Sequence, residues 1–345
     1  MAGSRGYRNY RGRTNRGKIA LTVFLILVIL AAVVVMLLQK HIVYDVTGTP
    51  HLELPWQEET KEEPELEEFE LTIQAETERK EEKDRLVRGF SVPARLDPEV
   101  WSLSVRQAQE TLGESCNAVL VTLKDKSGNV YFNSAAALPG TVQFMEDVTD
   151  VPLAAATDSG LFYSIARISC FRDSKAANWE TEAMGLMNTG GYIFYDGNNN
   201  QWLDPGKPAA RQYLCAMAAE AAALGFDEIL LTDVGYPTEG KLDKVDDGGV
   251  ERAGAIQTFL EELRATLPGE VRLSIELPMQ TVLTGQDEVS GHVLKEIAKR
   301  VDAIYAQVTP AECAEVGTIL QEVGCAFVPL LVEYDPSVRG SFLLQ

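Results

Sequence analysis

The chain has 345 residues and a formal net charge of -20 at pH 7, from 51 acidic and 31 basic side chains. Nucleic-acid-binding proteins carry basic surfaces, so this balance excludes nucleic acid as the expected partner. The five cysteines form no Cys-x-x-Cys pair and no cluster with the three histidines, which argues against a zinc site and a disulfide scaffold. The length suits one large domain with appendages.

The N-terminal segment has the pattern of a membrane anchor. Residues 1–18 hold six basic side chains and no acidic one, and residues 19–38 (IALTVFLILVILAAVVVMLL) are uncharged and long enough to cross a bilayer. A cleaved signal peptide is the alternative, but the apolar run is longer than usual and no small-x-small cleavage site precedes Lys40. We therefore expect a single-pass cell-membrane protein with a cytoplasmic N-terminus and an extracytoplasmic C-terminal domain.

An acidic linker is expected at residues 39–85. Between Glu58 and Asp84 there are 13 acidic and 4 basic residues, and few side chains that could form a core. Such a composition is typical of a solvated stalk or spacer. It would hold the following domain away from the membrane.

Residues 86–345 alternate between strand-like and helix-like patterns. We expect strands at 87–92, 118–123, 161–169, 228–233, 271–277, 303–308 and 327–333. Helical patterns cover 98–112, 208–224, 249–267, 289–301 and 311–323. Repeated β-α units predict a parallel sheet flanked by helices, and the length is that of a (β/α)8 TIM-like barrel.

Two features of this domain leave alternatives open. An open doubly wound sheet would normally carry a glycine-rich turn after its first strand, whereas Gly89 stands alone there. Only twelve residues follow Glu333, and residues 341–345 could supply an eighth strand. A parallel return usually needs about a dozen residues or more, so the barrel is expected to close irregularly or to be truncated.

Polar and aromatic residues gather where the third predicted strand ends. Arg167, Arg172 and Asp173 come at that end, while Asp204 precedes Pro205 in a pattern that could also be a simple helix N-cap. The long insert that follows carries four aromatic rings, Trp179, Tyr192, Tyr195 and Trp202. These rings could stack on sugar faces over the barrel mouth or pack a small core within the insert.

Three motifs in this order resemble the putative glycoside hydrolase domain family, a bacterial group with an α-amylase-like (β/α)8 barrel. They are IARISCFRD at 165–173, WLDP at 202–205 and GFDEILLTDVGYPTEG at 225–240. Segments 87–99, 117–134 and 284–308 are also similar to that family, so the resemblance covers residues 86–333. It implies a barrel that acts on a polysaccharide or cell-envelope glycan.

The central motif departs from the family pattern G-F-D-E-I-Q-F-D-Y-I-R-F-P. Leu230 replaces the glutamine, Val234 replaces the tyrosine, and Gly235 stands near the place of the arginine. The sixth strand likewise ends in residues 306–310 (AQVTP) instead of a Pro-Met-x-Tyr-Pro run. An arginine beside a catalytic carboxylate orients it and keeps it ionised. A second hypothesis is therefore an inactive barrel that binds glycan or protein.

Glycoside hydrolysis requires two carboxyl groups beside the scissile bond. Asp233 ends the fourth strand and is the expected nucleophile, and Glu276 ends the fifth strand and is the expected acid/base. The alternative for Glu276 is a strand-end residue that faces solvent or pairs with a lysine. Glu333 and Asp335 could add a third carboxylate. The expected substrate-binding residues are Arg167, Arg172, Asp173, Trp202, Asp204 and Tyr236.

Other chemistries find little support. The chain has no G-x-S-x-G elbow, H-E-x-x-H motif or Walker loop, and we expect neither metal nor cofactor. His292 begins a helical pattern and is expected at the surface or at a helix cap. The oxygen-bearing side chains of Asp196, Asn198 and Asn200 could hold calcium, but a plain turn is the simpler interpretation. Asp227 and Glu228 lie at the start of the fourth strand, at the barrel end that usually contributes to stability, so we do not expect them to be catalytic.

Overall fold

The computed structural model describes residues 86–94, 97–143, 153–158 and 161–345, with Leu21, Phe24 and residues 27–28, 42–44 and 50–52 of the N-terminal segment. The chain divides into two units, residues 1–73 and 74–345. In the first unit, β1 (Ile42–Tyr44) pairs with β2 (Pro50–Leu52) in antiparallel fashion.

Most of the expected anchor lies outside the described residues, and so do the basic tail and the acidic stalk. Leu21, Phe24 and residues 27–28 are helical and exposed. Among the residues that the structure describes, no helix is both long enough and apolar enough to cross a membrane.

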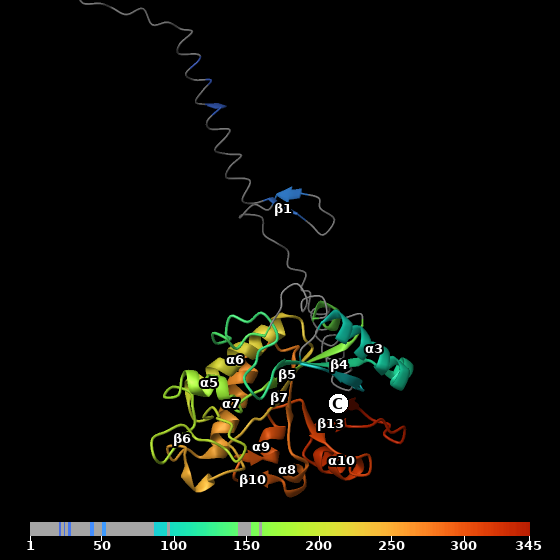
Figure 1. Ribbon diagram of the computed structural model, residues 1–345. Helices are drawn as coiled ribbons and strands as arrows, with labels where there is room; N and C mark the ends of the chain where they lie inside the picture. Colours follow the sequence, from blue (N-terminus) through green and yellow to red (C-terminus); the bar gives the residue numbers. More distant parts are fainter. Residues whose placement is uncertain are drawn as a thin grey trace, which may run out of the picture. The chain divides into compact units, whose positions relative to one another are not determined.

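The second unit is a closed barrel of eight parallel strands (Figure 1). Around the ring the order is β12 (Ala303–Gln307), β13 (Ala326–Leu331), β14 (Phe342–Leu344), β3 (Arg88–Val92), β4 (Ala118–Lys124), β5 (Tyr163–Ser169), β7 (Glu228–Thr232) and β9 (Arg272–Glu276). The predicted TIM-like barrel is confirmed, and closure of the ring excludes the open sheet.

The eighth strand is short but complete in its pairing. Leu330 of β13 pairs with Leu343, and Leu343 pairs with Gly89 of β3, so β14 joins both edges of the ring. Residues 332–341 connect β13 to β14 without a helix. Ten extended residues reach about 33 Å, well beyond the roughly 20 Å of a six-residue strand, so the chain returns without one. The barrel is therefore not truncated.

Helices cover the outside of the barrel (Figure 1). They are α3 (Pro98–Leu112), α5 (Ser174–Trp179), α6 (Pro208–Ala223), α7 (Arg252–Thr266), α8 (Met279–Thr284), α9 (Leu294–Ala298) and α10 (Cys313–Glu322). Asp97 caps α3 by accepting hydrogen bonds from the amides of Glu99 and Val100. The helix expected at 289–301 is wrong in its first half, where β10 (Gln286–Asp287) and β11 (His292–Val293) form an antiparallel hairpin.

Side chains alternate between two cores along each strand. Outward residues such as Ile229 and Leu231 of β7 pack in the layer between barrel and helices, and Leu230 packs inside the barrel. At the floor of the barrel, the fully buried carboxylate of Glu228 accepts a hydrogen bond of 2.7 Å from the Tyr163 hydroxyl. The Arg272 guanidinium lies 4.0 Å from the same carboxylate. In this floor cluster Glu228 lies at the amino ends of the strands and outside the cavity wall.

Candidate functional site

A cavity of about 760 Å³ opens at the carboxyl ends of the barrel strands. This volume falls within the roughly 300–1,000 Å³ of small-ligand sites. Inside the barrel the strands carry apolar residues such as Leu120 and Ile165, and the positions above them become polar. These polar positions form the cavity wall: Thr122 and Lys124 of β4, Arg167 and Ser169 of β5, Thr232 of β7, Glu276 of β9, and Gln307 of β12.

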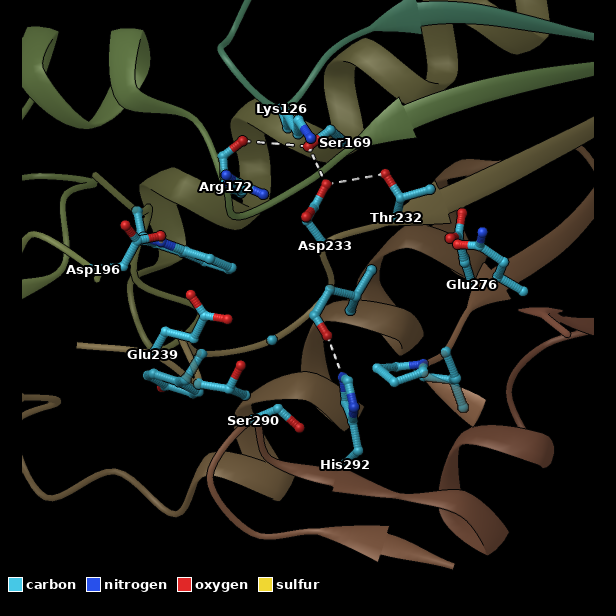
Figure 2. Close-up of a pocket in the computed structure, with 18 of the residues that line it drawn as sticks. Lys126, Ser169, Arg172, Asp196, Thr232, Asp233, Glu239, Glu276, Ser290 and His292 are labelled. Atoms are coloured by element: carbon cyan, nitrogen blue, oxygen red, sulfur yellow. Dashed lines mark hydrogen bonds between the residues drawn. The ribbon is translucent and has the colours of Figure 1, made fainter. Parts of the chain in front are cut away.

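Asp233 follows β7 directly and lines the cavity. Its Oδ2 accepts hydrogen bonds from the hydroxyl groups of Ser169 (2.7 Å) and Thr232 (3.2 Å), as Figure 2 shows. Its backbone has φ of 51°, a left-handed conformation that is rare outside glycine. The Phe171 amide donates to the Asp233 carbonyl oxygen at 3.0 Å. These contacts orient the carboxylate within the cavity.

Glu276 is the last residue of β9, the strand next to β7, and it lines the same cavity (Figure 2). Burial raises the pKa of its carboxyl group, the nearby Arg167 opposes that rise, and the charge of Asp233 adds to it. The alternative of a solvent-facing residue paired with a lysine does not describe this position. A carboxyl group with a raised pKa beside a second carboxylate is an arrangement suited to acid/base work.

Arg167 supplies a cation to both carboxylates from the neighbouring strand β5. Burial lowers the pKa of its guanidinium group, and the charges of Glu276 and Asp233 raise it in opposition. Its Nε and Nη2 atoms are buried, and neither has a hydrogen-bond partner within the described residues. Arg167 thus places a positive charge near the two carboxylates from another strand, without an ion pair to either among the described residues.

Gly235 occupies a position where no side chain fits. A Cβ atom there would lie 2.8 Å from the carbonyl oxygen of Ser290 and 3.0 Å from Nε2 of His292. The β10–β11 hairpin thus fills the space beside the central motif. Its presence accounts for glycine at the place of the arginine.

Three further residues predicted for substrate binding lie in the cavity wall: Arg172, Trp202 and Tyr236. The Trp202 indole donates to the Asp196 carboxylate at 3.0 Å, which fixes the ring at the cavity edge. Tyr236 is 2% exposed, and the guanidinium of Arg252 lies 4.9 Å from the centre of its ring.

The structure does not bring Asp173 and Asp204 into the cavity wall. Asp173 is fully buried, forms an ion pair of 2.8 Å with the Lys124 ammonium and caps α5 by accepting from the Ala176 amide. Asp204 accepts from the Gly206 amide at 2.8 Å, and burial raises its pKa. It does not cap a helix either, because α6 begins at Pro208 with Lys207 as its N-cap.

Glu333 and Asp335 also lie outside the cavity wall, and Asp335 accepts a hydrogen bond from the Ser337 amide in a surface turn. Trp202 packs partly against the insert's own small core around Leu186 and Phe194, which is one of the two roles expected for the aromatic insert. Trp179, Tyr192 and Tyr195 are exposed and lie outside the cavity wall.

Sequence reasoning missed His292, which is buried and lines the cavity instead of lying at the surface. Its Nε2 contacts the carbonyl oxygen of Val234, and burial lowers the pKa of its imidazole. The helical spacing of the apolar residues after position 289 hid the hairpin that carries it. A turn is present at Asp196, whose carboxylate accepts from the amides of Asn198 (2.8 Å) and Asn200 (2.9 Å).

Solved structures similar to the chain include a hypothetical protein from Ruminiclostridium thermocellum ATCC 27405, with 27% identity over 55% of this chain and 96% of that chain and a TM-score of 0.46. An α-galactosidase from Thermus thermophilus has 12% identity over 67% of this chain and 45% of its own, with a TM-score of 0.43. The glycoside hydrolase domain of PelA from Pseudomonas aeruginosa has 14% identity over 71% of this chain and 83% of its own, with a TM-score of 0.39.

No curated protein matches the chain in sequence. Residues 104–322 match the family model described as a putative glycosyl hydrolase domain, which is 219 of the 345 residues. This match favours glycoside hydrolase activity. The chain belongs to the putative glycosyl hydrolase domain family.

Proposed function

We propose that the chain is a membrane-anchored, extracytoplasmic glycoside hydrolase that cleaves a polysaccharide or cell-envelope glycan, with Asp233 as nucleophile and Glu276 as acid/base. One observation carries the proposal. The two carboxyl groups line a single cavity at the ends of adjacent barrel strands, and the Arg167 cation interacts with both. Barrel enzymes place their chemistry at this end of the strands.

The hydrogen bonds of Asp233 suit a nucleophile. The Ser169 and Thr232 hydroxyls hold Oδ2, and Oδ1 accepts no hydrogen bond from the described residues. In the first step, Oδ1 forms a bond to the anomeric carbon while the bond from that carbon to the glycosidic oxygen breaks. Glu276 gives its proton to the departing oxygen. The raised pKa of Glu276 favours the protonated form that this task requires.

In the second step the roles of Glu276 reverse. Its carboxylate takes a proton from water as the water oxygen bonds to the anomeric carbon, and the bond to Asp233 breaks. Arg167 stabilises the negative charge that moves between the two carboxyl groups. Arg172 and Trp202 would contact the sugar rings, with Trp202 offering an aromatic face, and the buried Tyr236 would support the wall.

The membrane location rests on the sequence of residues 1–38. The uncharged run 19–38 and the basic residues before it favour a single span with the barrel outside the cytoplasm. The acidic stalk would then separate the barrel from the lipid surface. A substrate in the cell envelope fits this placement.

A catalytically inactive barrel that binds glycan or protein is the second candidate. The observation that favours it is Gly235, where the central motif of the family has an arginine and the β10–β11 hairpin leaves no room for one. The site would then keep its polar wall for recognition alone.

A hydrolysis screen combined with a glycan array separates the two candidates. The full chain in detergent is compared with Asp233→Asn, with Glu276→Gln, and with Glu333→Gln as an exposed carboxylate control. Hydrolysis by the wild type and the control, with a loss of about 10²-fold or more in both cavity variants, supports the enzyme. Binding that survives Asp233→Asn, with no turnover of any substrate by the wild type, establishes the binding barrel instead.

A further inference from the structure

The β10–β11 hairpin grips the chain immediately after Asp233. Three successive residues are held: Val234 through its carbonyl oxygen, which contacts Nε2 of His292, Gly235 through close packing, and Tyr236 through its amide, which donates to the Ser290 carbonyl oxygen at 3.0 Å. Figure 2 shows Ser290 and His292 side by side below Asp233. The hydrogen bonds are made to backbone atoms of Val234 and Tyr236, so the hairpin fixes the path of the main chain after Asp233.

The backbone of Asp233 is left-handed, with φ of 51°. Aspartate adopts this conformation more readily than most residues with a side chain, and contacts on both sides of Asp233 hold it here. On the upstream side, the Phe171 amide donates to the Asp233 carbonyl oxygen at 3.0 Å. On the downstream side, residues 234–236 contact Ser290 and His292 of the hairpin. Asp233 is thus held between β5 and the hairpin.

The tautomer of His292 follows from its partner. A carbonyl oxygen only accepts hydrogen bonds, so Nε2 must carry the hydrogen that it donates to Val234. Nδ1 is buried and has no partner among the described residues. Burial lowers the pKa of the imidazole, while the hydrogen bond to Val234 and the charge of Asp287 oppose that effect. His292 therefore acts as a neutral, fixed donor.

We propose that the β10–β11 hairpin is a positioning device for the nucleophile and that His292 is its key positioning residue. The Nε2–H bond to Val234 and the fit against Gly235 hold Asp233 in the left-handed conformation that aims its carboxylate into the cavity. This inference rests on the proposed role of Asp233. It assigns a function to a hairpin that the sequence pattern predicts to be helical. It also explains why position 235 is a glycine.

The test measures kcat and KM of the full chain on the 4-nitrophenyl glycoside that the wild type hydrolyses fastest. His292→Leu removes the donor, and we expect kcat to fall about 10²-fold with KM within about twofold, because displacement of a reacting group by about 1 Å costs this much. His292→Gln places an amide N–H near the position of Nε2 and restores most of kcat. Gly235→Ala lowers kcat through its contact with the Ser290 carbonyl. Glu288→Gln, an exposed change on the same hairpin, leaves both constants unchanged.

The outcomes distinguish this inference from the proposed function. Thermal unfolding identifies which variants fold. If His292→Leu does not fold, Gly235→Ala and His292→Gln provide the test. Folded variants with unchanged kcat overturn the positioning role. If the wild type hydrolyses no glycoside, the proposed function fails, and crystal structures of the wild type and the His292 variants decide the inference. A left-handed Asp233 that persists without the Nε2 donor would then overturn it.

Discussion

Asp173→Asn should destabilise the protein strongly, although Asp173 lies outside the cavity wall. Asp173 and Lys124 are both fully buried, and Lys124 Nζ lies 2.8 Å from Asp173 Oδ2. Nζ also donates to the Ser169 carbonyl oxygen at 2.7 Å, so the ammonium has one neutral and one charged partner. The substitution removes the charged partner and leaves a buried cation.

The cost follows from this geometry. Removal of one partner from a buried ion pair costs about 3–5 kcal/mol of the free energy of unfolding. Asparagine keeps a side-chain oxygen for the Ala176 amide, so the cap of α5 remains. Asp173→Ala loses that cap as well, at about a further 1 kcal/mol. For a domain of this size, each kcal/mol shifts Tm by about 2–4 °C, so Asp173→Asn should lower Tm by roughly 6–20 °C.

Thermal and urea unfolding of the full chain measure this effect. The double variant Lys124→Met/Asp173→Asn is the matched control, since it removes the unpaired ammonium and should be more stable than Asp173→Asn alone. The reasoning would be refuted if Asp173→Asn kept the wild-type midpoint and lost glycan binding. Asp173 would then be a substrate ligand, as the sequence alone predicts.

The remaining predictions concern the site, the floor and the anchor. Glu276 must be protonated to act as an acid, so kcat/KM should fall as pH rises through its raised pKa, and Glu276→Gln should abolish this alkaline limb in a pH–rate profile. Arg167→Met should move the limb to higher pH, because Arg167 lowers the pKa of Glu276, and should reduce kcat. Glu228→Gln should lower Tm and leave kcat unchanged, since it disturbs only the floor cluster around Tyr163. Removal of residues 1–38 should move the protein from the membrane fraction to the soluble fraction in cell fractionation.

The barrel could be predicted because its signals are local. Each strand is a short apolar run bounded by turn residues, and the alternation along it places Asp233 and Glu276 at strand ends that face one cavity. Arg167 could be placed for the same reason. It lies two residues beyond the inward-facing Ile165, so it faces inward as well.

The parts that could not be predicted depend on contacts between distant residues. The sequence offers residues 341–345 as a possible eighth strand, but regular closure of the ring depends on the pairing of Leu343 with Gly89, about 250 residues away in the sequence. The β10–β11 hairpin is held by its fit against residues 234–236, and no local pattern records that fit. Asp173 resembles a site residue in the sequence because its motif ends a strand. Only the structure shows that its carboxylate lies outside the cavity wall and pairs with Lys124 of β4.

Covalent trapping of Asp233 tests the central claim most directly. The full chain is incubated with a panel of 2-deoxy-2-fluoroglycosyl fluorides, which slow the breakdown of a glycosyl–enzyme intermediate, and the labelled peptide is identified by mass spectrometry. We expect one sugar per chain, attached to Asp233, and no label in Asp233→Asn. Attachment to another carboxylate, or hydrolysis of a glycan by Asp233→Asn at the wild-type rate, would contradict the assignment of Asp233 as nucleophile.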